Sequence, residues 1–227
     1  MEKNKNRKLG IPMAFSYVII GLLCSCDILS EEDGEYVSPY ISELATVWTD
    51  SKGNLSLLQN DKDERFIISD TATANRYFIS ASPTSKKLEP DLSYRMLCYY
   101  EKNNNMAQIL GMNYVISKKA TPTSELAGRS IIQDPVEIQS IWISGGYLNI
   151  YVRINIFDKQ HELFSIKHSD SPKTIFSLYH DSHDDDYGYF RNACLSIPLS
   201  DYNLNKGDTV FFNCKGYKND YSYSLVY

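Results

Sequence analysis

The densest group of side chains that could do chemistry lies between residues 180 and 186. His180 and His183 alternate there with acidic residues, including Asp184 and Asp186. Imidazole and carboxylate together can bind a divalent cation. However, the spacing matches neither a calcium-binding EF-hand loop nor the His-Glu-x-x-His motif of zinc proteases. Because Asp and Ser favour turns, we predict a solvated acidic turn between two strands, with no metal.

Catalytic motifs do not accompany this segment. Glu162 and Asp170 neighbour His161 and His168, so an acid–base pair could form only if the fold brought them together. The sequence has no Gly-x-Ser-x-Gly elbow, phosphate-binding loop or dinucleotide fingerprint. We therefore predict a protein without catalytic residues or a cofactor. The alternative is a metal-dependent periplasmic enzyme centred on His180 and His183.

Tyrosine is frequent, with 18 residues, and five of these form the candidate binding surface: Tyr147, Tyr151, Tyr217, Tyr221 and Tyr223. An exposed Tyr offers rigid, amphipathic contact area for a protein or glycan ligand. The alternative is that these rings pack between sheets or cover a sheet edge, because Tyr is commonly half-buried.

Cys26 is the residue with the clearest chemical role. The chain begins with Lys3, Lys5, Arg7 and Lys8, and an apolar stretch too short to span a membrane follows from 11 to 24. The segment Leu23-Cys24-Ser25-Cys26 resembles the bacterial lipobox. This resemblance implies a signal peptide over residues 1–25, cleavage before Cys26, and a membrane anchor of lipid chains on that cysteine.

An acidic tether is predicted over residues 26–39. Within it, Ser30-Glu31-Glu32-Asp33 resembles the signal that exports lipoproteins of Bacteroidota to the cell surface, and the alternative is a plain solvated acidic tether. Removing residues 1–25, with four bases and one acid, takes the net charge from −5 to −8. Such acidity argues against a nucleic-acid partner. We expect a cell-envelope protein anchored to the outer membrane.

The remaining residues predict an all-β protein without a long amphipathic helix. Short strand patterns with turn signals between them suggest a small OB-like Greek-key barrel over residues 40–120. Residues 121–135 are rich in loop-forming types and predict a linker. Residues 136–227 hold strand patterns at the spacing of an antiparallel β-sandwich.

The strongest strand pattern runs from Tyr147 to Phe157. Leu148, Ile150 and Val152 alternate there with polar or aromatic residues, which is the period of a half-buried strand. Gly145-Gly146 precedes it and predicts a tight hairpin turn, because glycine adopts positive φ at little cost. Because side chains alternate between the two faces of a strand, Cys194 and Cys214 on later strands are expected to point to different faces, which argues against a disulfide between them.

Four segments between residues 134 and 202 resemble the NigD-like lipoproteins of Bacteroidota: Asp134–Val136, Ile141–Ile150, Leu178–Asp181 and Leu199–Tyr202. That family combines a lipoprotein signal, an N-terminal OB-like domain and a C-terminal β-sandwich. The resemblance implies this fold and an envelope location; because catalytic motifs are absent, we expect a non-catalytic binding or immunity-type module. Its ligand would be a protein, a peptide or a glycan.

Overall fold

The computed structural model describes residues 40–81, 88–126, 128–185 and 188–227. The predicted signal peptide (1–25), the acidic tether (26–39) with Cys26, and Asp186 all lie outside these described residues. The described ranges belong to one compact unit, Ser38–Tyr227. None of their helices is long and apolar enough to cross a membrane.

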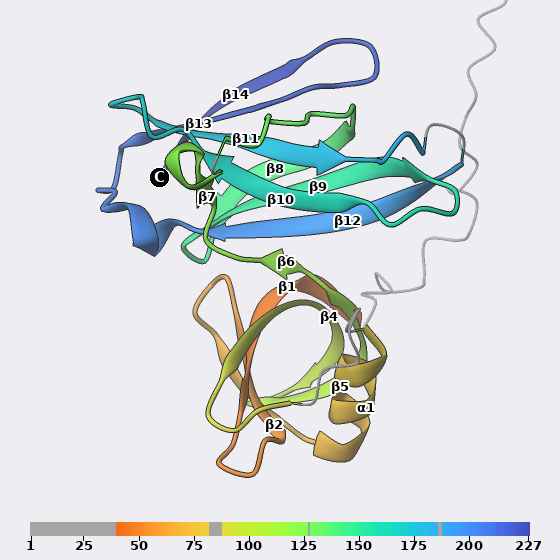
Figure 1. Cartoon of the computed structure of the whole chain (residues 1–227). Coiled ribbons are helices and arrows are strands. Elements are labelled where there is room, and N and C mark those ends of the chain that lie inside the picture. Colours follow the sequence, from red (N-terminus) through yellow and green to blue (C-terminus); the bar gives the residue numbers. More distant parts are fainter. Residues whose placement is uncertain (1–39, 82–87, 127, 186–187) are drawn as a thin grey trace, which may run out of the picture. The chain divides into compact units, whose positions relative to one another are not determined.

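The N-terminal part of this unit is a closed β-barrel in the strand order β1-β2-β3-β5-β4 (Figure 1). All neighbours are antiparallel except β3 and β5. Alternate residues point inward and form one apolar core that includes Val47, Leu58 and Tyr100. The barrel confirms the first half of the predicted fold class. Its strands are β1 (Tyr40–Thr49), β2 (Leu55–Asn60), β3 (Arg65–Ile68), β4 (Ser93–Asn103) and β5 (Met106–Tyr114).

Helix α1 (Thr71–Ala81) lies against the barrel between β3 and β4 in sequence. It has 11 residues, so it is a short helix added to the predicted all-β fold. Asp70 caps it by accepting a hydrogen bond from the backbone N–H of Thr73. The helix buries Ala74 and Phe78, which are one turn apart. Such a narrow apolar stripe gives a weak helical signal, although the cap and the four-residue spacing could have revealed it.

Two sheets form the C-terminal part, in the orders β14-β13-β11-β10-β7 and β6-β12-β9-β8 (Figure 1). Their inner faces share an apolar core that includes Ile150, Phe176 and Phe212. This arrangement confirms the predicted sandwich. Its longer strands are β8 (Glu137–Ser144), β9 (Tyr147–Ile156), β10 (Glu162–Lys167), β11 (Thr174–Asp181), β12 (Tyr189–Pro198), β13 (Thr209–Cys214) and β14 (Tyr221–Val226), and the 3₁₀ turn η2 spans Leu199–Tyr202.

The chain enters both sheets immediately after the barrel. Strand β6 (Ile116–Ser117) pairs in parallel with β12, and β7 (Thr121–Pro122) pairs in parallel with β10. A 3₁₀ turn η1 (Thr123–Glu125) follows. The segment predicted as a linker therefore contributes an edge strand to the sandwich.

The β8–β9 hairpin has the predicted turn. Gly145 and Gly146 have φ values of 57° and 79°, which suit a two-residue turn of the primed type. On β9, Leu148 and Ile150 are fully buried in the sandwich core, as the alternation predicts. Residues of the opposite parity, such as Asn149, therefore lie on the outer face of this sheet.

The cysteines of the described residues are unbonded and buried. Cys214 lies in the sandwich core, whereas Cys194 belongs to a separate cluster with Leu44 of the barrel, in agreement with the parity argument. Burial raises the pKa of the Cys98 thiol to about 12 and that of Cys194 to about 11. Because the thiolate is the reactive form, these residues act as small apolar side chains.

Candidate functional site

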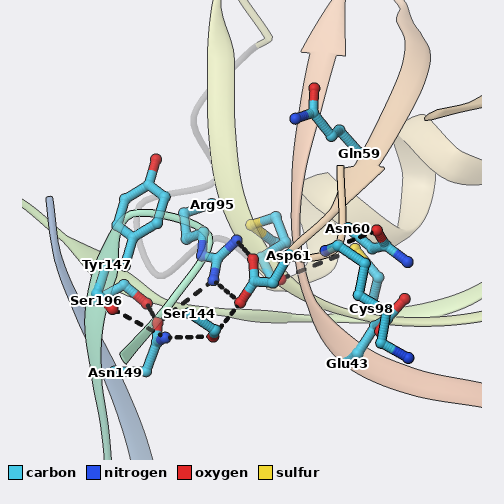
Figure 2. Close-up of polar contacts among 12 residues, drawn as sticks. Glu43, Gln59, Asn60, Asp61, Arg95, Cys98, Ser144, Tyr147, Asn149 and Ser196 are labelled. Atoms are coloured by element: carbon cyan, nitrogen blue, oxygen red, sulfur yellow. Dashed lines mark hydrogen bonds and ion pairs between the residues drawn. The ribbon is translucent and has the colours of Figure 1, made fainter. Parts of the chain in front are cut away.

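A buried ion pair marks the contact between the barrel and the outer face of the β8–β9–β12 sheet. Arg95 on β4 donates two hydrogen bonds to the Asp61 carboxylate in the turn after β2, at 2.5 and 2.8 Å (Figure 2). The two side chains are 2% and 16% exposed. The guanidinium also lies 4.3 Å from the centre of the Tyr147 ring on β9. Arg95 of the barrel thus has two specific partners, the Asp61 carboxylate and the Tyr147 ring.

Hydrogen bonds extend this pair into the sandwich. The Ser144 hydroxyl donates to Asp61 and accepts from the Asn149 side-chain amide at 3.0 Å (Figure 2). The Asn149 carbonyl oxygen accepts in turn from Arg95 and from the hydroxyl of Ser196. We call the set Asp61, Arg95, Ser144, Tyr147 and Asn149 the latch. Most of the Ser-Gly-Gly-Tyr-Leu-Asn stretch therefore serves the contact with the barrel.

Gly145 is required at the latch for a second reason besides its turn. A Cβ added at Gly145 would lie 2.3 Å from an oxygen of Asp61, which no side chain can tolerate without movement. At Gly146 an added Cβ would meet nothing within 4 Å. Both glycines have positive φ, so only the close approach to Asp61 distinguishes them.

These two glycines give a matched pair of substitutions. Gly146→Ala should cost about 1–2 kcal/mol, the usual penalty for a left-handed non-glycine residue. Gly145→Ala should cost that amount plus about 1–3 kcal/mol more, because its methyl group displaces Asp61. Chemical denaturation of both variants measures the difference. Equal losses would show that the hairpin does not touch Asp61 in solution.

A groove lies beside the latch, with a cavity volume of about 540 Å³. Strands of both the barrel and the sandwich line it. Its aromatic side chains are Tyr99, Trp142 and Tyr151, and Asp61 and Lys62 line it from the β2–β3 turn. Leu44, Leu97 and Cys194 add apolar surface, and the rest of the lining is polar: Ser42, Glu43, Ser140 and Ser144. We call these twelve residues the groove.

Three groove residues are partly buried and pack together. Trp142 and Tyr151 are half-buried and pack with Leu97 in one apolar cluster. The indole N–H of Trp142 donates to the Ser144 hydroxyl at 2.9 Å, which ties its ring to the latch. A pre-formed aromatic wall with polar groups at its edge is typical of a ligand site.

The structure does not gather the five predicted tyrosines into one surface. Tyr147 and Tyr151 lie on the barrel-facing side of β9, at the latch and in the groove. Tyr221 and Tyr223 stack on β14 at 6.1 Å between ring centres and pack against the sandwich core. Tyr217 accepts a hydrogen bond from a backbone N–H of β9 and meets Phe190 edge-on.

Sequence reasoning missed most residues of the site. Asp61, Arg95, Trp142 and Tyr99 were not among its candidates. Arg95 did carry a signal, because it interrupts a strand in which alternate neighbours are apolar, and a charged residue is seldom buried without a partner. The partner itself lies in a distant turn that no local pattern indicates.

The acidic segment after β11 differs from the predicted solvated turn. His183 and Asp184 are exposed and have positive φ, as a turn requires, but His180 and Asp185 are 2% and 5% exposed. His161, which precedes β10, explains their burial. Its Nδ1 lies 2.9 Å from Nε2 of His180, and its Nε2 lies 3.1 Å from the Asp185 carboxylate.

The hydrogen-bond partners of His180 determine which of its ring nitrogens carries the proton. His180 Nδ1 faces the backbone carbonyl of Asp134 at 3.1 Å, and a carbonyl can only accept, so this nitrogen carries the proton. His180 Nε2 is then an acceptor for His161. Burial, together with the neighbouring His161, lowers the pKa of His180, although the hydrogen bond to the Asp134 backbone opposes this shift.

Asp185 is fixed by several donors. Burial alone would raise its pKa, but hydrogen bonds from the Phe157 backbone, the His161 ring and the Lys159 backbone hold the pKa below its usual range. The described residues contain no group of three or more His, Cys, Asp or Glu side chains that could hold a metal ion. The hydrogen bonds of the His161 ring go to His180 and Asp185, whereas Glu162 pairs with Arg129. The cluster therefore fastens β11 to the chain that precedes β10.

Comparisons with known proteins agree with this architecture. Residues 119–227 match the family model of the NigD-like C-terminal beta sandwich domain. A NigD-like immunity protein from Bacteroides caccae has a similar structure, with a TM-score of 0.63 and 24% identity over 81% of this chain and 91% of that one. No curated protein matches the chain.

Two further solved structures share the fold at lower identity. A candidate toxin-related protein from Parabacteroides distasonis has a TM-score of 0.66 and 20% identity, over 83% of this chain and 93% of its own. A candidate lipoprotein from Bacteroides fragilis has a TM-score of 0.56 and 11% identity, over 83% and 98%. The barrel-plus-sandwich arrangement is thus common to these proteins.

Proposed function

We propose, from the match of residues 119–227 to the NigD-like C-terminal beta sandwich domain, that the chain is a lipid-anchored cell-envelope protein with a non-catalytic, immunity-type binding role. The similar structure from Bacteroides caccae is a NigD-like immunity protein, and the one from Bacteroides fragilis is a candidate lipoprotein. Both likenesses support the role and the location. The partner that we propose is a protein.

The groove is the observation that carries this proposal. It offers three aromatic side chains, one of them fixed by the latch, beside the charged side chains of Asp61 and Lys62. Protein interfaces obtain most of their affinity from aromatic anchors in desolvated pockets, with polar groups around them. A cavity of about 540 Å³ has room for a large side chain of a partner. A protein ligand therefore suits this site.

The proposal is tested by recovering a partner from native membranes with the intact lipoprotein. Tyr99→Ala removes a groove ring, and Tyr77→Ala removes an exposed ring on α1 as the matched control. We expect Tyr99→Ala to reduce recovery about tenfold or more, as at other aromatic anchors, and Tyr77→Ala to leave it unchanged. A partner that both variants retain equally would exclude the groove.

The anchor is tested separately at Cys26. Cys26→Ala should abolish incorporation of labelled fatty acid and leave the precursor uncleaved, because the thiol is the proposed attachment point. Metabolic labelling followed by membrane fractionation measures both effects. Cys24→Ala is the control, since it keeps a small residue two positions before the cleavage point. Labelling that survives in Cys26→Ala would refute the anchor.

The alternative of a metal-dependent enzyme at His180 and His183 gains no support from the geometry. Both ring nitrogens of His180 are engaged in hydrogen bonds, and the side chain is buried. His183 is exposed, and its Nδ1 lies 3.7 Å from an oxygen of Asp181. The two imidazoles thus have separate partners.

A further inference from the structure

We propose that Asp61 is a positioning residue through which the barrel fixes the Trp142 ring, and that the wall so formed receives one bulky apolar side chain of the protein partner. The inference rests on the proposed binding role of the groove. Asp61 belongs to the barrel, whereas Trp142 lies on β8 of the sandwich. The groove wall would therefore be set by a residue from the other half of the molecule.

Hydrogen-bond capacity makes the link specific. The Trp142 indole N–H can only donate, and its acceptor is the Ser144 hydroxyl. That hydroxyl accepts a second hydrogen bond from Asn149, which leaves it one proton to donate. Asp61 receives this proton. With both lone pairs and the proton in use, the Ser144 hydroxyl has one orientation, and the carboxylate determines it.

The fixed Ser144 hydroxyl in turn fixes the orientation of the Trp142 indole ring. Trp142 belongs to one apolar cluster with Leu44, Leu97 and Tyr151. Its one polar atom is held by Ser144, so rotation of the ring would leave a part-buried N–H without an acceptor. Asp61 cannot drift in compensation, because Arg95 binds both of its oxygens. The ring is thus fixed before any ligand arrives, which lowers the entropic cost of binding.

The lining of the groove indicates the ligand chemistry. Leu44, Leu97 and Cys194 supply apolar surface, and Trp142 and Tyr151 add two ring systems. Asp61 is already neutralised by Arg95, and the other charged residues of the lining, Glu43 and Lys62, have opposite signs, so the groove offers little net attraction for a cationic ligand. An aromatic or large aliphatic side chain would bury the most surface here. Lys62 remains as a charged group of the rim for the partner's backbone or carboxylates.

Indole N–H signals in nitrogen-15 NMR spectra of the mature protein test the positioning. The chain has two tryptophans, so Trp48 serves as an internal reference. Ser144→Ala removes the link but keeps the Arg95–Asp61 pair, and Ser144→Thr restores a hydroxyl. Asp61→Asn weakens the link directly. Its control is Asp63→Asn in the same turn, where the native residue already has positive φ.

We expect the Trp142 indole N–H to exchange about tenfold faster with solvent in Ser144→Ala and Asp61→Asn. In Ser144→Thr and Asp63→Asn, and at Trp48 throughout, exchange should stay as in the native protein. N-acetyl-phenylalanine amide, as a probe of the groove, should shift the Trp142 signal saturably in the native protein and more weakly in Ser144→Ala. Unchanged Trp142 exchange in Ser144→Ala would overturn the positioning role, even if Asp61→Asn fails to fold.

The outcome separates this inference from the proposed function. If exchange rises while Ser144→Ala still recovers its membrane partner normally, Asp61 positions the ring but the partner binds elsewhere, and the ligand assignment fails. If no protein is recovered at all, the exchange result still decides the positioning role. A probe that shifts Trp48 or surface signals instead of Trp142 would contradict the apolar side-chain assignment.

Discussion

Replacement of Arg95 by leucine is expected to lower the free energy of unfolding by about 3–5 kcal/mol, the cost of leaving one partner of a buried ion pair alone. Leucine removes both hydrogen bonds to Asp61 and the contact with the Tyr147 ring. The Asp61 carboxylate, only 16% exposed, would keep the Ser144 hydroxyl but lose its counter-charge. Denaturant titration with the mid-point and slope fitted together measures the loss.

Two further variants make this result specific to the latch. Combining Arg95→Leu with Asp61→Leu should recover much of the lost stability, because no buried charge is left unpaired. Lys102→Leu breaks the ion pair with Glu64, whose side chains are 40% and 47% exposed. It should change stability little, since solvent screens exposed pairs. A double variant no more stable than Arg95→Leu would mean that packing, rather than charge, explains the loss.

Acidification is expected to destabilise the protein through His180. The pKa of this histidine lies below its ordinary value of 6.5, so the folded chain keeps it neutral while the unfolded chain binds a proton. The unfolded state therefore gains protons as the pH falls below about 6.5, and stability falls with it. One such proton contributes a slope of at most about 1.4 kcal/mol per pH unit. Denaturation between pH 7.5 and 5 measures the slope.

His180→Gln should reduce the slope of stability against pH by up to the contribution of one proton, about 1.4 kcal/mol per pH unit. Glutamine can donate and accept hydrogen bonds but does not titrate. Its imperfect fit to Asp134 and His161 should cost about 1–3 kcal/mol at pH 7. His183→Gln is the matched control in the same segment, because His183 is exposed. The assignment fails if the two variants show the same pH dependence.

The fold class could be predicted because it depends on local patterns. The alternation on β9 and the Gly145-Gly146 turn are each visible within about a dozen residues, and the structure confirms both. Helix α1 escaped prediction because its buried stripe consists of Ala74 and Phe78 alone. Where the pattern is short, tertiary contact with the barrel decides the conformation.

The site could not be predicted to the same degree, because its residues meet only in the fold. The alternation on β9 correctly places Tyr147, Asn149 and Tyr151 on one face, but it cannot tell whether that face meets solvent or another element. His161 finds His180 because β10 and β11 pair in register. Polar residues on a strand indicate a face without identifying what covers it.

The entry of the chain into both sheets has a consequence for how the protein is made. In the two short strands, Ile116 pairs with Leu195 and Thr121 pairs with Ile166. Neither strand can therefore pair until its partner, much later in the sequence, has been synthesised. The barrel, by contrast, is complete in sequence at Tyr114. Because the chain is synthesised from its N-terminus, we expect the barrel to close first, followed by a sandwich limited by contacts of high sequence separation. A fragment that begins at residue 136 would leave the edges of β10 and β12 bare, and bare edges invite aggregation.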